Sequence, residues 1–275
     1  MSHRHEQVSH RNRLSEIRNI MHSMKTLSIM ETLKLERCLK NQSAITESIE
    51  KIATDFLHFH PHVLPEAEPV SNFILLMGSQ RGFCGDFNEQ LIKKLQQYLN
   101  NSTENRSTLI AVGSKLHSLF QETHHNIIEL EGADVAEEVS SVVTALAKIF
   151  ATHKDPASLY AIHHNNQHNA LCVEKLLPPF QALADIKTNE LTPPLLNLTN
   201  RDFFLELTEH YLFNALHHIL YLSLMIENKH RTLHLENATH HLDEKTDELN
   251  RKINALRQEE IIEEIEVILL NSSTP

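Results

Sequence analysis

The sequence predicts a mixed α+β and α/β fold, in which a long antiparallel coiled coil of the N- and C-terminal segments flanks a small inserted α/β domain. Residues 1–60 and 195–274 contain neither glycine nor proline, the two residues that break helices most strongly. All 5 glycines lie between these segments, where short apolar runs alternate with helix-like stretches. We therefore expect three parts: an N-terminal helix over 1–60, an α/β domain over 70–190 and a C-terminal helix over 195–275.

The N-terminal segment shows the spacing of a helix with one buried stripe. At 1.5 Å per residue the two terminal segments would form helices of about 80 and 110 Å, far longer than those of ordinary globular domains. Apolar residues recur every three or four positions, as in a coiled coil, although Ser28 and several charged residues interrupt the pattern. The predicted stripe comprises Ile17, Ile20, Met24, Leu27, Ile45, Ile49, Ile52, Phe56 and Phe59.

The middle of the chain reads as a mainly parallel sheet covered by helices. Apolar runs of about five residues are followed by helical stretches, the order expected of a Rossmann-like α/β domain. We expect strands over 73–77, 108–112, 126–130, 158–162 and 171–175, and helices over 86–101, 115–120 and 135–151.

The C-terminal segment has the same apolar spacing and the opposite charge balance. Residues 1–40 carry eight Lys or Arg against four Asp or Glu, whereas residues 201–275 carry seven against fourteen. Opposite charges and two unpaired apolar stripes favour pairing of the two helices over two solvated helices that never meet. The seam of the second helix is expected at Leu242, Leu249, Ile253 and Leu256, continuing to Ile261, Ile265 and Ile268.

Composition excludes several classes of protein. The formal net charge of −11 argues against a nucleic-acid binder, which needs a basic surface. The 3 cysteines include no CxxC pair, so neither a disulfide scaffold nor a cysteine-rich zinc site is expected. No apolar run is long enough to cross a bilayer, and the first ten residues lack the apolar core of a secretory signal. We expect a soluble protein of a reducing compartment.

A glycine-containing turn is the best candidate for binding chemistry. It runs from Gly78 to Asn88, between a predicted strand and a predicted helix, where a phosphate could lie at a helix N-terminus. Its glycine spacing matches neither the dinucleotide fingerprint nor the Walker loop. A tight turn that needs unusual backbone angles is therefore the favoured interpretation, with Cys84 as an inert thiol rather than a nucleophile.

Histidine, at 21 residues, is the other candidate for site chemistry. Metal ligands could come from His58-x-His60-x-His62, from His163-His164-x3-His168 or from His240-His241. None of these groups has a carboxylate or cysteine at a known metal-ligand spacing, so surface histidines are the plainer interpretation. We expect no metal, no cofactor and no catalytic group.

Three places in the chain carry a resemblance to the gamma subunit of F-type ATP synthases. The turn Ser79–Asn88, SQRGFCGDFN, is similar to the family's (D/S)-(R/K)-G-L-C-G-x-(F/L)-N. Glu236–Thr239 resembles its (K/E)-N-A-T, and Asn250–Arg251 with Arg257–Gln258 resembles its N-(R/K)-x-R-Q element. Ser23–Lys25 resembles the (A/T)-M-K step of its first helix. The match covers essentially the whole chain in the correct order.

The chain also departs from the usual family pattern. Ile261–Ile262 stand where Ile-Thr is common, Val267–Asn271 replace the usual Gly-Ala ending, and Asn19–Ser23 replace a Thr-x-Lys-Ile-Thr stretch. These departures resemble the alternative, N-type branch of the family, which is sometimes sodium-linked.

The resemblance implies a non-catalytic rotor, the central stalk that couples ion-driven rotation of a membrane ring to ATP synthesis or hydrolysis. Its implied partners are the alpha and beta subunits of the catalytic hexamer, the epsilon subunit and the membrane c-ring, at the cytoplasmic face of the bacterial inner membrane. Arg257 and Gln258 would contact the catalytic subunits' catch loop, with Met24 and Lys25 nearby on the shaft. The bearing tip would be Ile261, Ile262, Ile265, Ile268 and Leu269, and the family-motif turn Gly78, Arg81, Gly82, Cys84, Gly85 and Asn88.

Two functions of other classes remain open at this point. A free-standing coiled-coil scaffold would self-associate through its apolar stripes. A nucleotide-binding α/β protein would use the turn from Gly78 to Asn88.

Overall fold

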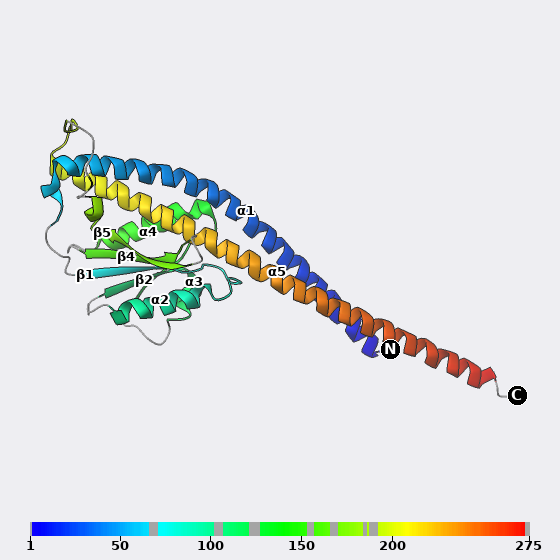
Figure 1. Cartoon of the computed structure of the whole chain (residues 1–275). Helices are drawn as coiled ribbons and strands as arrows, with labels where there is room; N and C mark the ends of the chain where they lie inside the picture. The colour runs from blue at the N-terminus through cyan, green and yellow to red at the C-terminus, as the bar shows by residue number, and fades with distance from the viewer. Residues whose placement is uncertain are drawn as a thin grey trace. The chain divides into compact units, whose positions relative to one another are not determined.

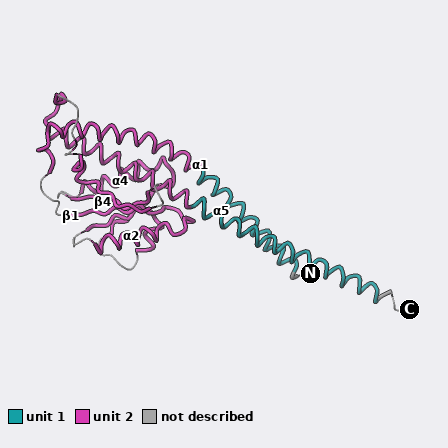
Figure 2. The backbone as a smooth tube through the Cα atoms, viewed as in Figure 1, with its two compact units in different colours: residues 1–29, 231–275 teal, residues 30–230 magenta. Residues whose placement is uncertain are grey.

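Two long helices dominate the structure, a computed structural model that describes residues 2–65, 71–101, 107–120, 127–152, 157–165, 170–183, 186 and 192–272. Helix α1 spans Ser2–Phe59 and helix α5 spans Asn200–Ser272, an uninterrupted 73 residues (Figure 1). The long helices predicted at both ends of the chain are therefore confirmed. They contribute to two structural units, residues 1–29 with 231–275 and residues 30–230 (Figure 2), which we call the helical unit and the sheet unit.

The sheet unit contains a five-stranded sheet in the order β3-β2-β1-β4-β5. Strands β1 to β4 run parallel, and β5 pairs antiparallel with β4. The mainly parallel sheet is thus confirmed, while the closer likeness to a Rossmann domain stays a prediction. The strands are β1 (Ser71–Met77), β2 (Ser107–Val112), β3 (Ile127–Leu130), β4 (Ala157–His164) and β5 (Leu171–Leu177).

Helices connect and cover the parallel strands. Helix α2 (Phe87–Asn101) follows β1, the short α3 (Ser114–His117) follows β2, and α4 (Val139–Ala151) precedes β4 (Figure 1). The predicted helix over 115–120 is shorter than expected, since the described helix ends at His117. Single turns of 3₁₀ helix lie at Pro61–Val63, Ala136–Glu138 and Gln181–Leu183.

The core of the sheet unit is one apolar cluster shared by the sheet, α2, α4 and the first half of α5. Ile74 and Leu75 of β1 are 1% and 0% exposed, as expected for a central strand covered on both faces. Leu216 and Met225 of α5 belong to the same cluster. A second, smaller cluster surrounds Phe56 at the end of α1.

The apolar stripe predicted for α1 is wrong in its first part. Ile17, Ile20 and Leu27 are 46%, 60% and 63% exposed, so they do not form a buried seam. Ser28, a predicted interruption of the stripe, is 4% exposed. Because the distance between packed helices depends on the side chains at the contact, a serine there suits close packing. Coiled-coil geometry as such stays a prediction.

The rest of the predicted seam is partly buried. In α1, Ile49 and Phe56 are buried as expected, whereas Ile45 and Ile52 are each 47% exposed. In α5, Leu249 is 8% exposed, which agrees with the prediction.

Several histidines contradict the expectation of surface positions. His163 and His164 on β4 are 2% and 0% exposed, and His217 on α5 is 6% exposed. They are buried because their strand and helix lie inside the sheet unit. His240 and His241 are exposed as predicted, and His168 lies outside the described residues.

No helix within the described parts of the chain is sufficiently long and apolar to pass through a lipid bilayer.

Candidate functional site

Ion pairs join the two helices of the helical unit. Arg4 Nη1 lies 3.1 Å from Glu260 Oε2, Lys25 Nζ lies 2.9 Å from Glu236 Oε1, and Arg18 forms a two-pronged contact with Asp243. The partner numbers on α5 fall as those on α1 rise, so the helices run antiparallel. In each of these three contacts the basic side chain lies on α1 and the acidic side chain on α5. The hydrogen bond from Arg18 also lowers the pKa of Asp243.

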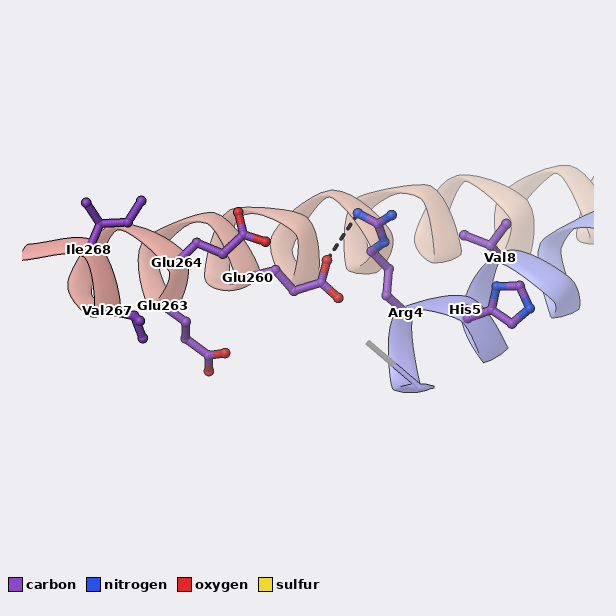
Figure 3. Close-up of a pocket in the computed structure, with 8 residues that line it drawn as sticks. All are labelled: Arg4, His5, Val8, Glu260, Glu263, Glu264, Val267 and Ile268. Carbon is purple, nitrogen blue, oxygen red and sulfur yellow. Dashed lines mark ion pairs between the residues drawn. The ribbon is translucent and has the colours of Figure 1, made fainter. Parts of the chain in front are cut away.

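Helix α5 continues past the start of α1. Helix α1 begins at Ser2, and Arg4, two residues later, already forms an ion pair with Glu260. Figure 3 shows this ion pair. An open cleft of about 1010 Å³ lies where α5 extends beyond the first turn of α1. Its lining combines basic, acidic and apolar side chains: Arg4, His5, Val8, Glu260, Glu263, Glu264, Val267 and Ile268.

The predicted bearing tip lies on this extension of α5. All ten residues from 261 to 270 are exposed, so a large part of each predicted apolar side chain faces solvent. Large apolar side chains left in water commonly mark a surface that another protein covers. The five predicted residues are Ile261 at 45%, Ile262 at 56%, Ile265 at 51%, Ile268 at 65% and Leu269 at 60% exposed.

The four residues predicted to contact the catalytic subunits fall into two separate places. Arg257 and Gln258 are exposed, and Arg257 forms no ion pair with any described residue. Met24 and Lys25 are half-buried, and Lys25 contacts Glu236. Glu236 precedes Arg257 by 21 residues of continuous helix, which is about 30 Å at 1.5 Å per residue. The structure therefore does not bring Met24 and Lys25 together with Arg257 and Gln258.

The glycine-containing turn is held by its own side chains. The backbone N–H of Ser79 donates to Asn88 Oδ1 at 2.9 Å, and Asn88 Nδ2 donates to Ser79 Oγ at 2.8 Å. Gly85 adopts φ +61°, a conformation that favours glycine. A Cβ on Gly78 would lie 2.6 Å from Leu116 Cβ, so only glycine fits there without movement.

Gln80 and Arg81 tie this turn to the neighbouring loops. Gln80 Oε1 accepts from the backbone N–H groups of Ser114 at 3.0 Å and Gly132 at 2.8 Å. Arg81 Nη2 donates to Asp134 Oδ2 at 2.7 Å. Sequence reasoning missed Gln80, because its role depends on loops 34 and 52 residues away.

The same contacts leave little at this turn for a nucleotide. The backbone N–H groups of Ser79, Ser114 and Gly132 are already paired with Asn88 and Gln80, and the adjoining cavity measures about 20 Å³. Cys84 is 5% exposed, and its Sγ lies 3.4 Å from the carbonyl oxygens of Arg81 and Gly82. The arrangement fits a structural tie between three loops.

Among the described residues, no three His, Cys, Asp or Glu side chains are placed to hold a metal ion.

Comparison with known proteins gives a match along nearly the whole chain. A family model described as ATP synthase matches residues 6–270. The chain belongs to the ATP synthase family. The match includes both long helices and every described strand of the sheet.

Curated relatives within this family are gamma chains. The ATP synthase gamma chain of Clostridium botulinum (strain Hall) is 23% identical, with 94% of each chain covered. The gamma chain of Rickettsia felis is 24% identical, and the alignment covers 92% of both chains. The gamma chain of a Sulfurovum species is 25% identical, and the alignment covers 93% of this chain and 95% of the relative. The resemblance to gamma subunits is thereby confirmed, whereas the assignment to the N-type branch stays a prediction.

Solved structures of low sequence identity share the fold. The rotor of the Euglena gracilis mitochondrial ATP synthase in rotational state 1 aligns with a TM-score of 0.57 at 15% identity, covering 94% of this chain and 99% of that one. A chain from the same organism's OSCP/F1/c-ring structure gives a TM-score of 0.61 at 15% identity, covering 99% and 94%.

Proposed function

We propose that this chain is the central-stalk gamma subunit of a rotary F-type ATP synthase. In that role it couples ion-driven rotation of a membrane ring to ATP synthesis or hydrolysis in a catalytic hexamer. The observation that carries the proposal is the match to gamma chains over 94% of the chain, combined with two long antiparallel helices. The partners follow from the same role: alpha and beta subunits around the helices, and the epsilon subunit and c-ring beside the sheet unit.

The helical unit supports a role in transmitting torque. Helix α5 runs 73 residues without a glycine or proline, the usual causes of kinks. Ion pairs to α1 at Glu236, Asp243 and Glu260 show that the two helices contact each other at three levels. Two helices that contact each other at several levels can transmit torque as a single unit. A coiled coil would be suited to transmitting torque.

The end of α5 supports the proposed contacts with the hexamer. An exposed apolar tip turns easily inside an apolar sleeve, because such a contact has no directional bonds to break. Arg257 and Gln258 lie just before the tip with their polar groups free to bind a loop. We assign these two residues to the catch-loop contact, and Met24 and Lys25 to a separate level of the shaft.

The chain itself is proposed to be non-catalytic. The hexamer supplies the nucleotide sites, and the subunit works at the cytoplasmic face of the bacterial inner membrane as a peripheral member of the complex. The turn from Gly78 to Asn88 then serves to hold the sheet unit together.

Assembly with the hexamer is the direct test. The tagged chain is expressed with alpha and beta subunits, purified in mild detergent from membranes, and examined for stoichiometry and ATP hydrolysis. We expect one copy per hexamer and hydrolysis that depends on the chain. Recovery of the chain alone, as a self-associated species, would support the scaffold function instead. Binding of nucleotide by the isolated chain would support the nucleotide-binding alternative.

A double substitution tests the catch-loop assignment. Arg257→Ala with Gln258→Ala should lower ATP hydrolysis by the assembled complex about fivefold, the effect of losing a hydrogen bond of about 1 kcal/mol. Lys93→Ala with Gln97→Ala removes the same kinds of side chain from the exposed face of α2 and should leave turnover unchanged. Equal turnover in both double variants would overturn the assignment of Arg257 and Gln258.

A further inference from the structure

A cavity separate from the glycine-containing turn lies within the sheet unit. It measures about 330 Å³ and is lined by residues of α1, β4, β5 and α5. All of its described lining residues lie between Ser43 and Leu222, so the cavity belongs to the sheet unit alone. Its volume is within the range of sites that bind small molecules.

The lining of this cavity is acidic. Glu47 and Glu50 reach it from α1, and Glu174 reaches it from β5. Glu174 Oε2 lies 3.2 Å from His163 Nε2. Glu47 and Glu50 are exposed and form no ion pair with any described residue. Because no lysine or arginine stands among the described lining residues, the cavity should attract cations and repel anions.

The charge of Glu174 is balanced within the chain. Burial by itself lowers the pKa of His163, but its hydrogen bonds with Cys172 and Glu174 outweigh burial and raise the pKa to about 9. The hydrogen bond from His163 in turn lowers the pKa of Glu174. These two residues therefore form a pair of opposite charges near pH 7, and the excess negative charge belongs to Glu47 and Glu50.

The two hydroxyl groups that line the cavity already donate their protons within the chain. Ser43 Oγ donates to the carbonyl oxygen of Leu39 at 3.0 Å, and Thr46 Oγ1 donates to that of Gln42 at 3.1 Å. Asn214 is 4% exposed, and its Nδ2 donates to Thr46 Oγ1 at 2.7 Å. The hydroxyls therefore have oxygen lone pairs, rather than protons, left for a ligand.

His218 adds a buried nitrogen to the lining. Its Nδ1 is buried and has no hydrogen-bond partner among the described residues. Burial lowers the pKa of His218, so the ring is neutral near pH 7 and one of its nitrogens is an acceptor. A buried polar atom without a partner costs free energy, which a donor on a ligand would recover. This nitrogen favours a ligand with N–H groups independently of the carboxylates.

We propose that this cavity binds a small primary ammonium compound with a short hydrocarbon chain. An ammonium group carries three donors and no acceptor, which matches a lining of carboxylates, hydroxyl lone pairs and an unpaired imidazole nitrogen. The hydrocarbon chain suits the apolar part of the lining, which α5 supplies through Ala215, Ile219 and Leu222. The proposal does not rest on the function of the chain as a rotor.

Butylammonium is the probe for this site. A titration of the full-length chain at pH 7 and low ionic strength, followed by saturation-transfer difference NMR, should show saturable binding. We expect a Kd of about 1 mM, as is typical of a ligand of this size. No saturable binding would overturn the proposal. Displacement by MgCl₂ that exceeds displacement by NaCl of the same ionic strength would indicate a metal-ion site and overturn the ligand class.

Two relatives of the probe separate its charge from its donors. 1-Butanol has the same chain without the charge, and butyltrimethylammonium has the charge without N–H groups. Both should bind at least about fivefold more weakly than butylammonium, because each lacks the charge-assisted hydrogen bonds. Equal binding of 1-butanol would overturn the charge assignment, and equal binding of butyltrimethylammonium would overturn the role of the acceptors.

Paired substitutions test the residues. Glu47→Gln with Glu50→Gln should raise the Kd of butylammonium at least about fivefold, because the excess negative charge is removed. Glu206→Gln with Glu209→Gln changes the net charge equally at exposed positions of α5 outside the cavity, and should leave the Kd unchanged. An unchanged Kd in the first variant, or equal losses in both, would overturn the assignment. The comparison of three ligands on the wild type decides the proposal even where a variant fails to fold.

Discussion

The two units of the chain use the same two helices in different ways. In the sheet unit, α5 contributes buried residues such as Ile219 and Met225, each 1% exposed, to a core shared with the sheet. In the helical unit, the same helix presents Ile262 and Ile268, which are 56% and 65% exposed. One region of α5 is thus packed within the chain, and the other leaves large apolar side chains exposed. The difference suggests that substitutions in the two units will change different observables.

Tyrosine fluorescence can follow the sheet unit alone. The chain has 4 tyrosines and no tryptophan, and Tyr98, Tyr160, Tyr211 and Tyr221 all lie within residues 30–230. Urea unfolding monitored by tyrosine emission therefore reports on this unit.

The largest expected effect on stability distinguishes a buried isoleucine from an exposed one. Ile74→Ala should destabilise the sheet unit by about 2 to 5 kcal/mol, the usual range for emptying a buried site. Ile268→Ala should leave tyrosine-detected unfolding unchanged, because the side chain is 65% exposed, and should instead lower turnover in the assembled complex. A loss of sheet stability from Ile268→Ala would break the distinction between the units.

Alanine substitutions at two glycines of the turn should differ in their effect on the stability of the sheet unit. Gly78→Ala should cost about 1 to 3 kcal/mol, because the new Cβ would meet Leu116 Cβ at 2.6 Å. Gly82→Ala is the matched control, since the nearest atom to its new Cβ is 4.0 Å away, and should change stability by less than about 0.5 kcal/mol. Urea midpoints of the two variants provide the measurement, and similar losses at both positions would contradict the packing argument.

The pH dependence of the sheet unit's stability should reflect two buried histidines whose pKa values are shifted in opposite directions. The pKa of His163 is raised to about 9, so its stabilisation is complete below pH 6.5 and is lost as the pH rises through 9. Burial lowers the pKa of His164 to about 4, so stability also falls as the pH drops from 6.5 toward 4. We expect maximum stability near pH 6.5, with a loss on the alkaline side on the order of 3 kcal/mol.

His163→Gln isolates the alkaline part of this dependence. The difference in free energy of unfolding between wild type and variant should shrink between pH 6.5 and pH 9.5. A difference that stays constant over this range would show that His163 is not protonated at pH 6.5 in the folded chain.

The smallest effect is expected at an exposed ion pair of the helical unit. Arg18→Gln removes the ion pair between Arg18 and Asp243. The side chains of these two residues are 43% and 46% exposed. Water and salt screen such a pair, so circular dichroism should show a change in thermal midpoint close to experimental error. A large, salt-sensitive drop would mean that ion pairs rather than packing hold the helical unit together.

The sequence was informative where structure depends on local pattern. Glycine-free ends predicted both long helices, and apolar runs predicted the strands to within a few residues, as with 73–77 inside β1. The predicted tip residues Ile261, Ile262, Ile265, Ile268 and Leu269 are exposed in the structure, and their role as a bearing stays a prediction.

The sequence did not predict contacts and burial that depend on residues far apart along the chain. Spacing alone favoured Ile20 and Leu27 for the seam of α1, yet Ser28 is the buried residue, because the fit against another helix decides which face is covered. His163 and Cys172 are nine residues apart in sequence and face each other only because β4 and β5 pair in one register. A residue-by-residue reading of the histidines could not show that contact.

The step at Glu260, where α1 begins beside α5, has a mechanical consequence. Two rods fixed side by side resist bending far more than one, so flexural stiffness falls abruptly at this level of the helical unit. Beyond it, α5 continues as a single rod for its last twelve residues, from 261 to Ser272. Sideways displacement at the end is therefore absorbed by the single helix, and the paired section remains aligned while it turns.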